Sequence, residues 1–251
     1  MKGGRVVKGT QFVALRDVGD PAEMAVAYER EGADEICFLD ISASAEERAT
    51  LLDVARRTAE QLFIPLTVGG GVRSADDVGR ALRSGADKVS VNTAAVEQPQ
   101  ILSESAARFG AQCIVASIDA KQRPGTNGRQ AVGPHWEVYV RGGRQATGLD
   151  VVEWARECVQ RGAGEILLTS IDRDGARIGY DLELTQAVAA AVDVPVIASG
   201  GAGAPAHVPE VLRQTDADAA LVAGILHERI TTVAAIKNAM RAAGLATRGL
   251  E

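Results

Sequence analysis

The sequence has little of what commonly marks a metal site, a secreted scaffold or a membrane protein. Its 251 residues include only three cysteines, Cys37, Cys113 and Cys158, which are far apart and lack metal-ligand spacing. The three histidines carry no motif, and no apolar run is long enough to cross a bilayer. No signal peptide is recognisable. We therefore expect a cytosolic protein with reduced thiols, no metal, no cofactor and no contact with membranes.

Positive charge is not in surplus either. The formal net charge of −6 argues against a nucleic-acid-binding surface. Any phosphate on a ligand must then be held by local backbone donors rather than by a basic field. Hydrophobic residues make up 46% of the chain, which is enough to build a large core.

What the chain does have is a repeat with a period of 130 residues. Segments 66–72 and 196–203 are short apolar runs that end in paired glycines, and they follow Pro65 and Pro195. A period this long spans several supersecondary units, so it indicates two similar halves rather than a solenoid. Glycine lets the main chain approach a ligand closely, and a helix that starts there offers free N–H groups to an anion.

Apolar segments alternate with helical patterns along most of the chain. Seven strands are predicted, starting near residues 35, 64, 87, 112, 165, 194 and 218. Because these strands are continuously apolar, they favour a parallel sheet covered by helices. Residues 2–20 are interpreted as a loop or a small hairpin. Residues 120–148 interrupt the alternation and are interpreted as an inserted hairpin or loop.

Seven strands are one short of a closed barrel, which needs eight. The second half supplies four strands and the first half supplies three. We therefore predict a single α/β domain over residues 1–251, a (βα)8 TIM barrel built from two half-barrels, whose first strand is missing from this chain. Strands 36–41 and 219–223 should then face each other, unpaired, across the gap.

Polar residues recur at the ends of the predicted strands, where barrels of this kind bind their ligands. Each could be only a helix cap or a turn residue, but together they indicate a site. Two glycine turns in opposite halves suit a substrate with a phosphate at each end. An aspartate among them could act as a general acid or base, or could simply cap a helix or pair with an arginine. The residues are Asp40, Thr67, Asn92, Thr93, Asp119, Thr169, Asp172, Asp174, Ser199 and Gly224.

Several motifs together resemble the cyclase subunits of imidazole glycerol phosphate synthase, and the resemblance covers essentially the whole chain. The related phosphoribosyl isomerase shares the half-barrel repeat. It is the alternative, and it ranks second because it usually carries Gly-Thr where this chain has Asn92-Thr93. The motifs are Gly4-Arg5-Val6-Val7-Lys8-Gly9, Val68-Gly69-Gly70-Gly71, Ser117-Ile118-Asp119-Ala120-Lys121, Thr169-Ser170-Ile171-Asp172-Arg173-Asp174-Gly175 and Ala198-Ser199-Gly200-Gly201-Ala202.

The resemblance implies a (βα)8-barrel lyase of histidine biosynthesis. Such a subunit joins ammonia to a bisphosphorylated formimino-ribulosyl aminoimidazole carboxamide ribonucleotide. The products are imidazole glycerol phosphate and aminoimidazole carboxamide ribotide. A glutaminase subunit is expected to dock at the N-terminal face as a heterodimer partner and to send ammonia through the barrel.

The resemblance also implies roles for individual residues. Asp119 is one of two acid/base aspartates, and Lys8 lies on a loop that closes over the substrate. Three charged residues of the ammonia entrance are Glu35, Lys88 and Glu165. The expected substrate and phosphate contacts are Gly70, Gly71, Asn92, Thr93, Thr169, Asp174, Gly175, Ser199, Gly200, Gly201 and Gly224.

The chain departs from the family at its start. In the family, the Gly4–Gly9 motif follows a first strand that carries the other catalytic aspartate and a basic entrance residue. We expect this strand to be encoded directly upstream of Met1. A barrel that lacks it is the other possibility: a catalytically impaired protein that only docks to the glutaminase or activates it.

Overall fold

The computed structural model describes residues 1, 3–10, 13–40, 45–123 and 135–249. Its main feature is a strongly curled sheet in which seven parallel strands follow one another in chain order. This confirms the α/β class and the seven predicted strand positions. The strands are β3 (Ile36–Leu39), β4 (Leu66–Gly69), β5 (Lys88–Val91), β6 (Ile114–Gln122), β9 (Glu165–Ser170), β10 (Val196–Ser199) and β11 (Ala219–Ala220).

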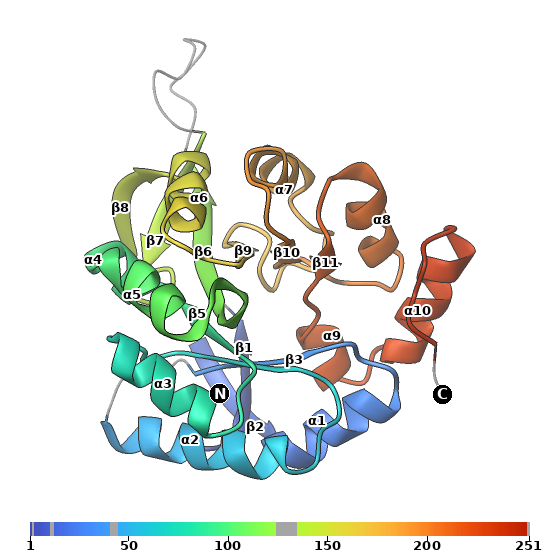
Figure 1. Cartoon of the computed structure of the whole chain (residues 1–251). Coiled ribbons are helices and arrows are strands. Elements are labelled where there is room, and N and C mark those ends of the chain that lie inside the picture. Colours follow the sequence, from blue (N-terminus) through green and yellow to red (C-terminus); the bar gives the residue numbers. More distant parts are fainter. Residues whose placement is uncertain (2, 11–12, 41–44, 124–134, 250–251) are drawn as a thin grey trace.

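Helices surround the curled sheet. In Figure 1 they form a ring around the strands. Apolar side chains of both layers are buried against each other in two clusters. The larger helices are α1 (Pro21–Arg30), α2 (Ala45–Ala59), α3 (Ala75–Arg83), α5 (Gln100–Phe109), α6 (Val151–Gln160), α7 (Leu182–Ala189), α8 (His207–Gln214) and α10 (Val233–Ala242). Two short helices, α4 (Thr93–Glu97) and α9 (Gly224–His227), and a 3-10 turn at Ala111–Cys113 complete the described set.

Local sequence explains where several helices begin. Asp20 accepts hydrogen bonds from the backbone N–H groups of Ala22 and Glu23, and Pro21 occupies the first helical position of α1. Asp150, Asp181 and other short polar residues cap later helices in the same way. No helix in the described part of the chain is long and apolar enough to cross a membrane.

β3 and β11 form the two edges of the parallel sheet and do not pair with each other in the described residues. Both are shorter than predicted. β3 ends at Leu39, with Ile41 outside the described residues, and β11 has only two residues, although the backbone N–H of Leu221 still donates a 2.8 Å hydrogen bond to Ala198 of β10. The expected strand before residue 1 stays a prediction.

Helices nevertheless join the two edges. The Tyr28 hydroxyl on α1 lies 2.8 Å from His227 Nδ1 on α9. The backbone N–H of Val233 donates to Glu31 at 3.0 Å, which ties the start of α10 to the end of α1. Tyr28 and Ala33 also pack against both apolar clusters of the core. The first and last helices are therefore neighbours, and the ring of helices closes.

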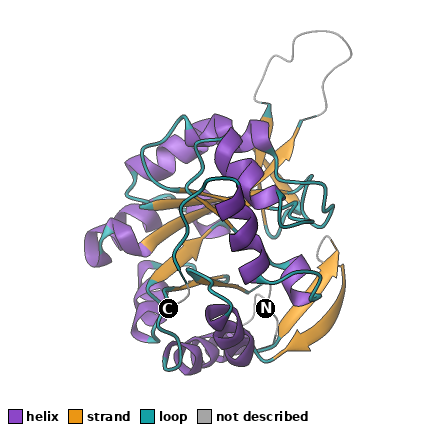
Figure 2. Ribbon diagram, turned by 90° about the vertical axis from the view of Figure 1, so that its right-hand side faces the viewer, coloured by secondary structure: helices purple, strands orange, loops and turns teal. Residues whose placement is uncertain are grey.

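Two antiparallel hairpins stand on the side of the molecule that lies to the right in Figure 2. One pairs β1 (Val6–Thr10) with β2 (Val13–Gly19), and of the two interpretations of residues 2–20 it is the hairpin that is found. The other pairs β7 (Trp136–Val140) with β8 (Gln145–Asp150), and β7 continues the sheet along the end of β6. The parallel strands end on this same side.

Candidate functional site

The first glycine turn follows β4 and is shaped by close packing. Gly70 and Gly71 have φ angles of 103° and 67°, which side chains other than glycine rarely adopt. A Cβ atom on Gly70 would lie 2.2 Å from the carbonyl oxygen of Asp40. The turn therefore needs glycine for its own backbone path, and it leaves an open main chain at the carboxyl edge of the sheet.

The second glycine turn follows β10 and packs against the β9–α7 turn. Gly200 and Gly201 have φ angles of 89° and 111°. A Cβ atom on Gly201 would lie 2.1 Å from the carbonyl oxygen of Gly179, which is joined to Gly201 by a backbone hydrogen bond of 2.9 Å. Gly175, with φ of 75°, lies in the same β9–α7 turn. A side chain at Gly201 would thus disturb the fold as well as any ligand.

Asp119 lies midway between these turns along the sheet. β6 is two strands from β4 on one side and two strands from β10 on the other. Asp119 pairs in register with Thr169 of β9, which in turn pairs with Ser199 of β10. Three polar residues therefore form one row across adjacent strands. Since neighbouring strands are about 4.8 Å apart, each glycine turn is about 10 Å from Asp119 along the sheet.

The pKa of the Asp119 carboxyl is raised to about 6. Burial in the sheet is the main cause, and the charge of Asp174 adds to it. The side chain of Asn92 acts in the opposite direction, because its Nδ2 donates a hydrogen bond of 2.9 Å to Asp119 Oδ2. A carboxyl that titrates this close to neutral pH can both accept and return a proton, as a general acid/base must.

The turn after β9 brings further polar groups to this edge. Burial raises the pKa of Asp174, while a hydrogen bond from the backbone of Gly175 opposes the rise. Asp172 accepts a 2.7 Å hydrogen bond from the backbone N–H of Gln122 and so fastens the turn to β6. Asp174 is therefore the aspartate of this turn whose charge acts on Asp119, while Asp172 has a structural contact.

The remaining predicted contacts are spread over the same edge. The Thr93 hydroxyl, at the start of α4, accepts a 3.0 Å hydrogen bond from the backbone N–H of Arg141 in the β7–β8 turn. Gly224 is the first residue of α9. Lys8 lies in β1, opposite Arg16. Thr93 and Gly224 thus follow strand ends, whereas Lys8 lies in a separate two-stranded sheet.

At the opposite edge, three charged residues predicted from the sequence meet. Lys88 Nζ lies 2.8 Å from Glu35 and 2.6 Å from Glu165, and all three side chains are largely buried. Burial alone would lower the pKa of Lys88, but the two carboxylates outweigh it and raise the pKa. The second oxygen of Glu165 is buried and has no partner among the described residues.

Thr67 was predicted at the carboxyl edge, and this prediction is wrong. Its hydroxyl donates to Glu35, so it belongs to the charged cluster around Lys88. Thr67 is the second residue of β4, and the strand continues through Gly69 before it turns. The sequence also gave no sign that Tyr139 would lie beside Asp119, because that pairing depends on β7 folding back along β6.

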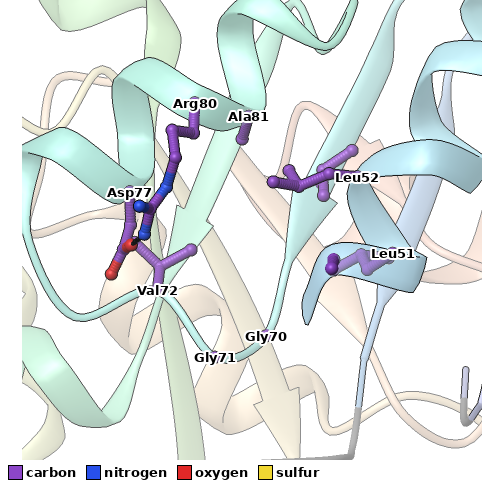
Figure 3. A pocket seen from close by; sticks show the side chains of 10 residues that line it. Leu51, Leu52, Gly70, Gly71, Val72, Asp77, Arg80 and Ala81 are labelled. Atoms are coloured by element: carbon purple, nitrogen blue, oxygen red, sulfur yellow. Dashed lines mark hydrogen bonds and ion pairs between the residues drawn. The ribbon is translucent and has the colours of Figure 1, made fainter. Parts of the chain in front are cut away.

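A cavity of about 360 Å³ adjoins the first glycine turn. Figure 3 shows it between α2 and α3, with Leu51 and Leu52 on one side and the Gly70–Gly71 turn below. Its described walls are mainly apolar, and Arg80 on these walls forms an ion pair with Asp77. These walls do not suit a phosphate group. We therefore assign the predicted anion contacts to the backbone of the turn and not to this cavity.

The fold and this edge define an α/β protein with a curled parallel sheet, two glycine turns and, at one rim, a carboxyl whose pKa is raised to about 6. A model of the family described as histidine biosynthesis protein matches residues 1–232. Imidazole glycerol phosphate synthase subunit HisF of Myxococcus xanthus (strain DK1622) is 68% identical over 250 residues, which cover 100% of this chain and 95% of the relative. The subunit HisF of Thermosynechococcus vestitus is 57% identical over 237 residues, or 94% of this chain and 83% of the relative.

The chain belongs to the histidine biosynthesis family, as one of its imidazole glycerol phosphate synthase cyclase subunits, which are lyases. Both relatives carry the name of this subunit and not that of the isomerase, so the isomerase alternative is not supported. This outcome confirms the family to which the sequence motifs pointed.

Proposed function

We propose that this chain forms imidazole glycerol phosphate and aminoimidazole carboxamide ribotide from ammonia and a bisphosphorylated formimino-ribulosyl aminoimidazole carboxamide ribonucleotide. The architecture belongs to the same proposal: a (βα)8-type barrel of two similar halves, each with one glycine turn. Identity of 68% to a named HisF subunit supports it. The absence of a nucleic-acid partner fits the net charge of −6, and a cytosolic location belongs to the same proposal.

The observation that carries the proposal is the place of Asp119 midway between Gly70 and Gly200 along the sheet. A long substrate with a phosphate held at each turn would extend across Asp119. The backbone of Gly70, Gly71, Gly200 and Gly201 would bind the phosphates through N–H groups. Asp119 would then accept and return a proton at the middle of the substrate.

The other predicted contacts would complete this site. Each lies near one of the two turns or near Asp119, apart from Lys8 in the separate β1–β2 sheet. Their role is to orient the substrate by hydrogen bonds and to exclude water from it. They are Lys8, Thr93, Thr169, Asp174, Gly175, Ser199 and Gly224.

Ammonia would enter at the opposite edge, past Glu35, Lys88 and Glu165. A glutaminase subunit would cover this edge. Phe63, in the turn just before β4, is 93% exposed, although large apolar side chains are usually buried. It lies at the same end of the strands as Lys88, so it is a suitable anchor for a partner protein.

Turnover with ammonium tests the activity. Asp119→Asn should lower it by about 10²–10⁴-fold, the usual contribution of a general acid or base. Asp150→Asn is the matched control, because asparagine caps a helix about as well as aspartate and Asp150 only caps α6. Wild-type-like turnover of Asp119→Asn would refute the assigned role. A folded wild-type chain without ammonium turnover that still activates a glutaminase would favour the impaired-barrel alternative.

Glutaminase binding tests the docking edge. Phe63→Asp should weaken the complex at least tenfold and leave turnover with ammonium unchanged, because the residue is remote from Asp119. Ile178→Asp is the control: Ile178 is 64% exposed and follows β9 at the other edge. If both variants bind the glutaminase equally well, the partner docks elsewhere.

A further inference from the structure

Asn92 is placed like a helix cap but does not act as one. It is the residue between β5 and α4, with φ of −117° and ψ of −93°, and its side chain makes no capping hydrogen bond. Asparagine at such a position commonly accepts a hydrogen bond from the first turn of the helix, which stabilises the helix. Something else therefore determines where this amide points.

The amide is directed at Asp119. Its Nδ2 donates a 2.9 Å hydrogen bond to Asp119 Oδ2. Its Oδ1 is buried and has no partner among the described residues. Buried acceptors are rarely left unpaired, and each one costs stability. The Asn92 side chain therefore does not cap α4, and its Oδ1 has no partner among the described residues. Its hydrogen bond goes to Asp119, the proposed acid/base.

The groups around Asp119 show why this hydrogen bond affects the ionisation of its carboxyl. Asp174, from the turn after β9, repels the ionised carboxylate. Tyr139 of β7 lies opposite Asp119 in register, and Lys121 Nζ lies 5.7 Å from the centre of the Tyr139 ring. Glu137 is two residues before Tyr139 in β7 and lies opposite Lys121. Asn92 is the neutral donor in this group, and its hydrogen bond to a charged acceptor favours the ionised, oriented form.

We propose that Asn92 is a positioning residue for Asp119, whose carboxylate it holds in one orientation through Nδ2. This differs from the role expected from the family resemblance, in which Asn92 contacts a phosphate. One of the two N–H bonds of the amide is used by Asp119, and Oδ1 can only accept a hydrogen bond. The inference rests on the proposed function only in taking Asp119 as the acid/base.

The decisive measurement does not need turnover. In the free chain labelled with 13C at aspartate carboxyls, the Asp119 signal is assigned by its loss in Asp119→Asn and is then titrated. Asn92→Leu, which is close in size but donates no hydrogen bond, should raise the pKa of Asp119 by about one pH unit, a tenfold change in its ionisation equilibrium. Asn92→Asp should raise it further, because a second carboxylate then faces the first.

Steady-state kinetics with ammonium separate positioning from phosphate binding. In Asn92→Leu, the limb of the pH profile of kcat that reports the ionisation of Asp119 should move to higher pH by the same amount as the titration. KM should change less than threefold. Thr93→Val is the contrast at the neighbouring residue: it should change KM without moving that limb.

Three outcomes decide the inference. An Asp119 titration unchanged to within about 0.3 pH units in Asn92→Leu overturns it. So does a large rise in KM with an unmoved limb, which would make Asn92 a phosphate contact. If Asn92→Leu does not fold, Asn92→Ala, which also removes the donor and adds no charge, decides by the same titration. A shifted titration in a chain without turnover would refute the proposed function and leave the positioning role standing.

Discussion

Replacing Asp119 with asparagine should make the protein more stable at neutral pH while it lowers turnover by about 10²–10⁴-fold. Asp119 is held in a partly buried site where burial and the charge of Asp174 oppose ionisation. Asparagine has the same shape, carries no charge and can still accept the hydrogen bond from Asn92. The substitution therefore removes the cost of a buried charge without creating a cavity, a trade of stability for activity that is common at active sites.

The sign and size of the effect follow from the pKa difference between the folded and unfolded states. In the folded protein Asp119 keeps its proton up to a pH of about 6, and its ordinary pKa is 3.8. Between these values the folded state binds more protons, so stability falls as the pH rises. The cost is complete above pH 6 and comes to about 3 kcal/mol for a shift of about two pH units. Near pH 4.5 it is only about 1 kcal/mol.

Urea unfolding of both proteins at pH 4.5 and pH 8 measures this effect. Asp119→Asn should gain up to about 3 kcal/mol at pH 8, which corresponds to a rise in Tm on the order of 5–10 °C. The gain should shrink at pH 4.5. Asp150→Asn should show no such pH-dependent gain. A loss of stability in Asp119→Asn at pH 8, or an equal gain at both pH values, would refute the argument that Asp119 is a strained carboxyl.

Three further changes test the rest of the structure. Lys88→Met should lower the free energy of unfolding in urea at pH 8 by about 3 kcal/mol, because two largely buried glutamates lose their cation; it should also reduce turnover with glutamine more than turnover with ammonium. Gly70→Ala should cost more stability in urea than Gly244→Ala, since both have positive φ but only Gly70 would clash, so an equal loss of about 1 kcal/mol would contradict the packing argument. Tyr28→Phe should cost about 1 kcal/mol if its hydroxyl joins the first and last helices, and an unchanged unfolding midpoint would show that it does not.

The sequence alone was enough to predict elements whose signals are local. The seven parallel strands are mostly apolar, and Asp20, Asp150 and Asp181 precede helical patterns, so fold class and element order could be inferred before any contact was known. The 130-residue repeat likewise showed two glycine turns, because glycine is visible in the sequence wherever the backbone requires it.

Other features depended on residues far apart in the chain. Thr67 belongs to the charged cluster and not to the carboxyl edge, because the length of β4 and its register against β3 decide which end a residue occupies. Tyr139 reaches Asp119 only through the antiparallel return of β7. Gly201 is needed against Gly179 as well as at a ligand turn.

The contact between Asn92 and Asp119 shows the physical reason most clearly. The sequence predicts each residue at the end of a strand, and the resemblance suggests a role for each. However, 27 positions separate them in the chain. Sequence patterns specify the type and direction of a local element, whereas hydrogen bonds between side chains depend on strand order, register and burial. These are set only when the sheet curls and brings β5, β6 and β9 together, and so the tertiary structure alone decided the titration of Asp119.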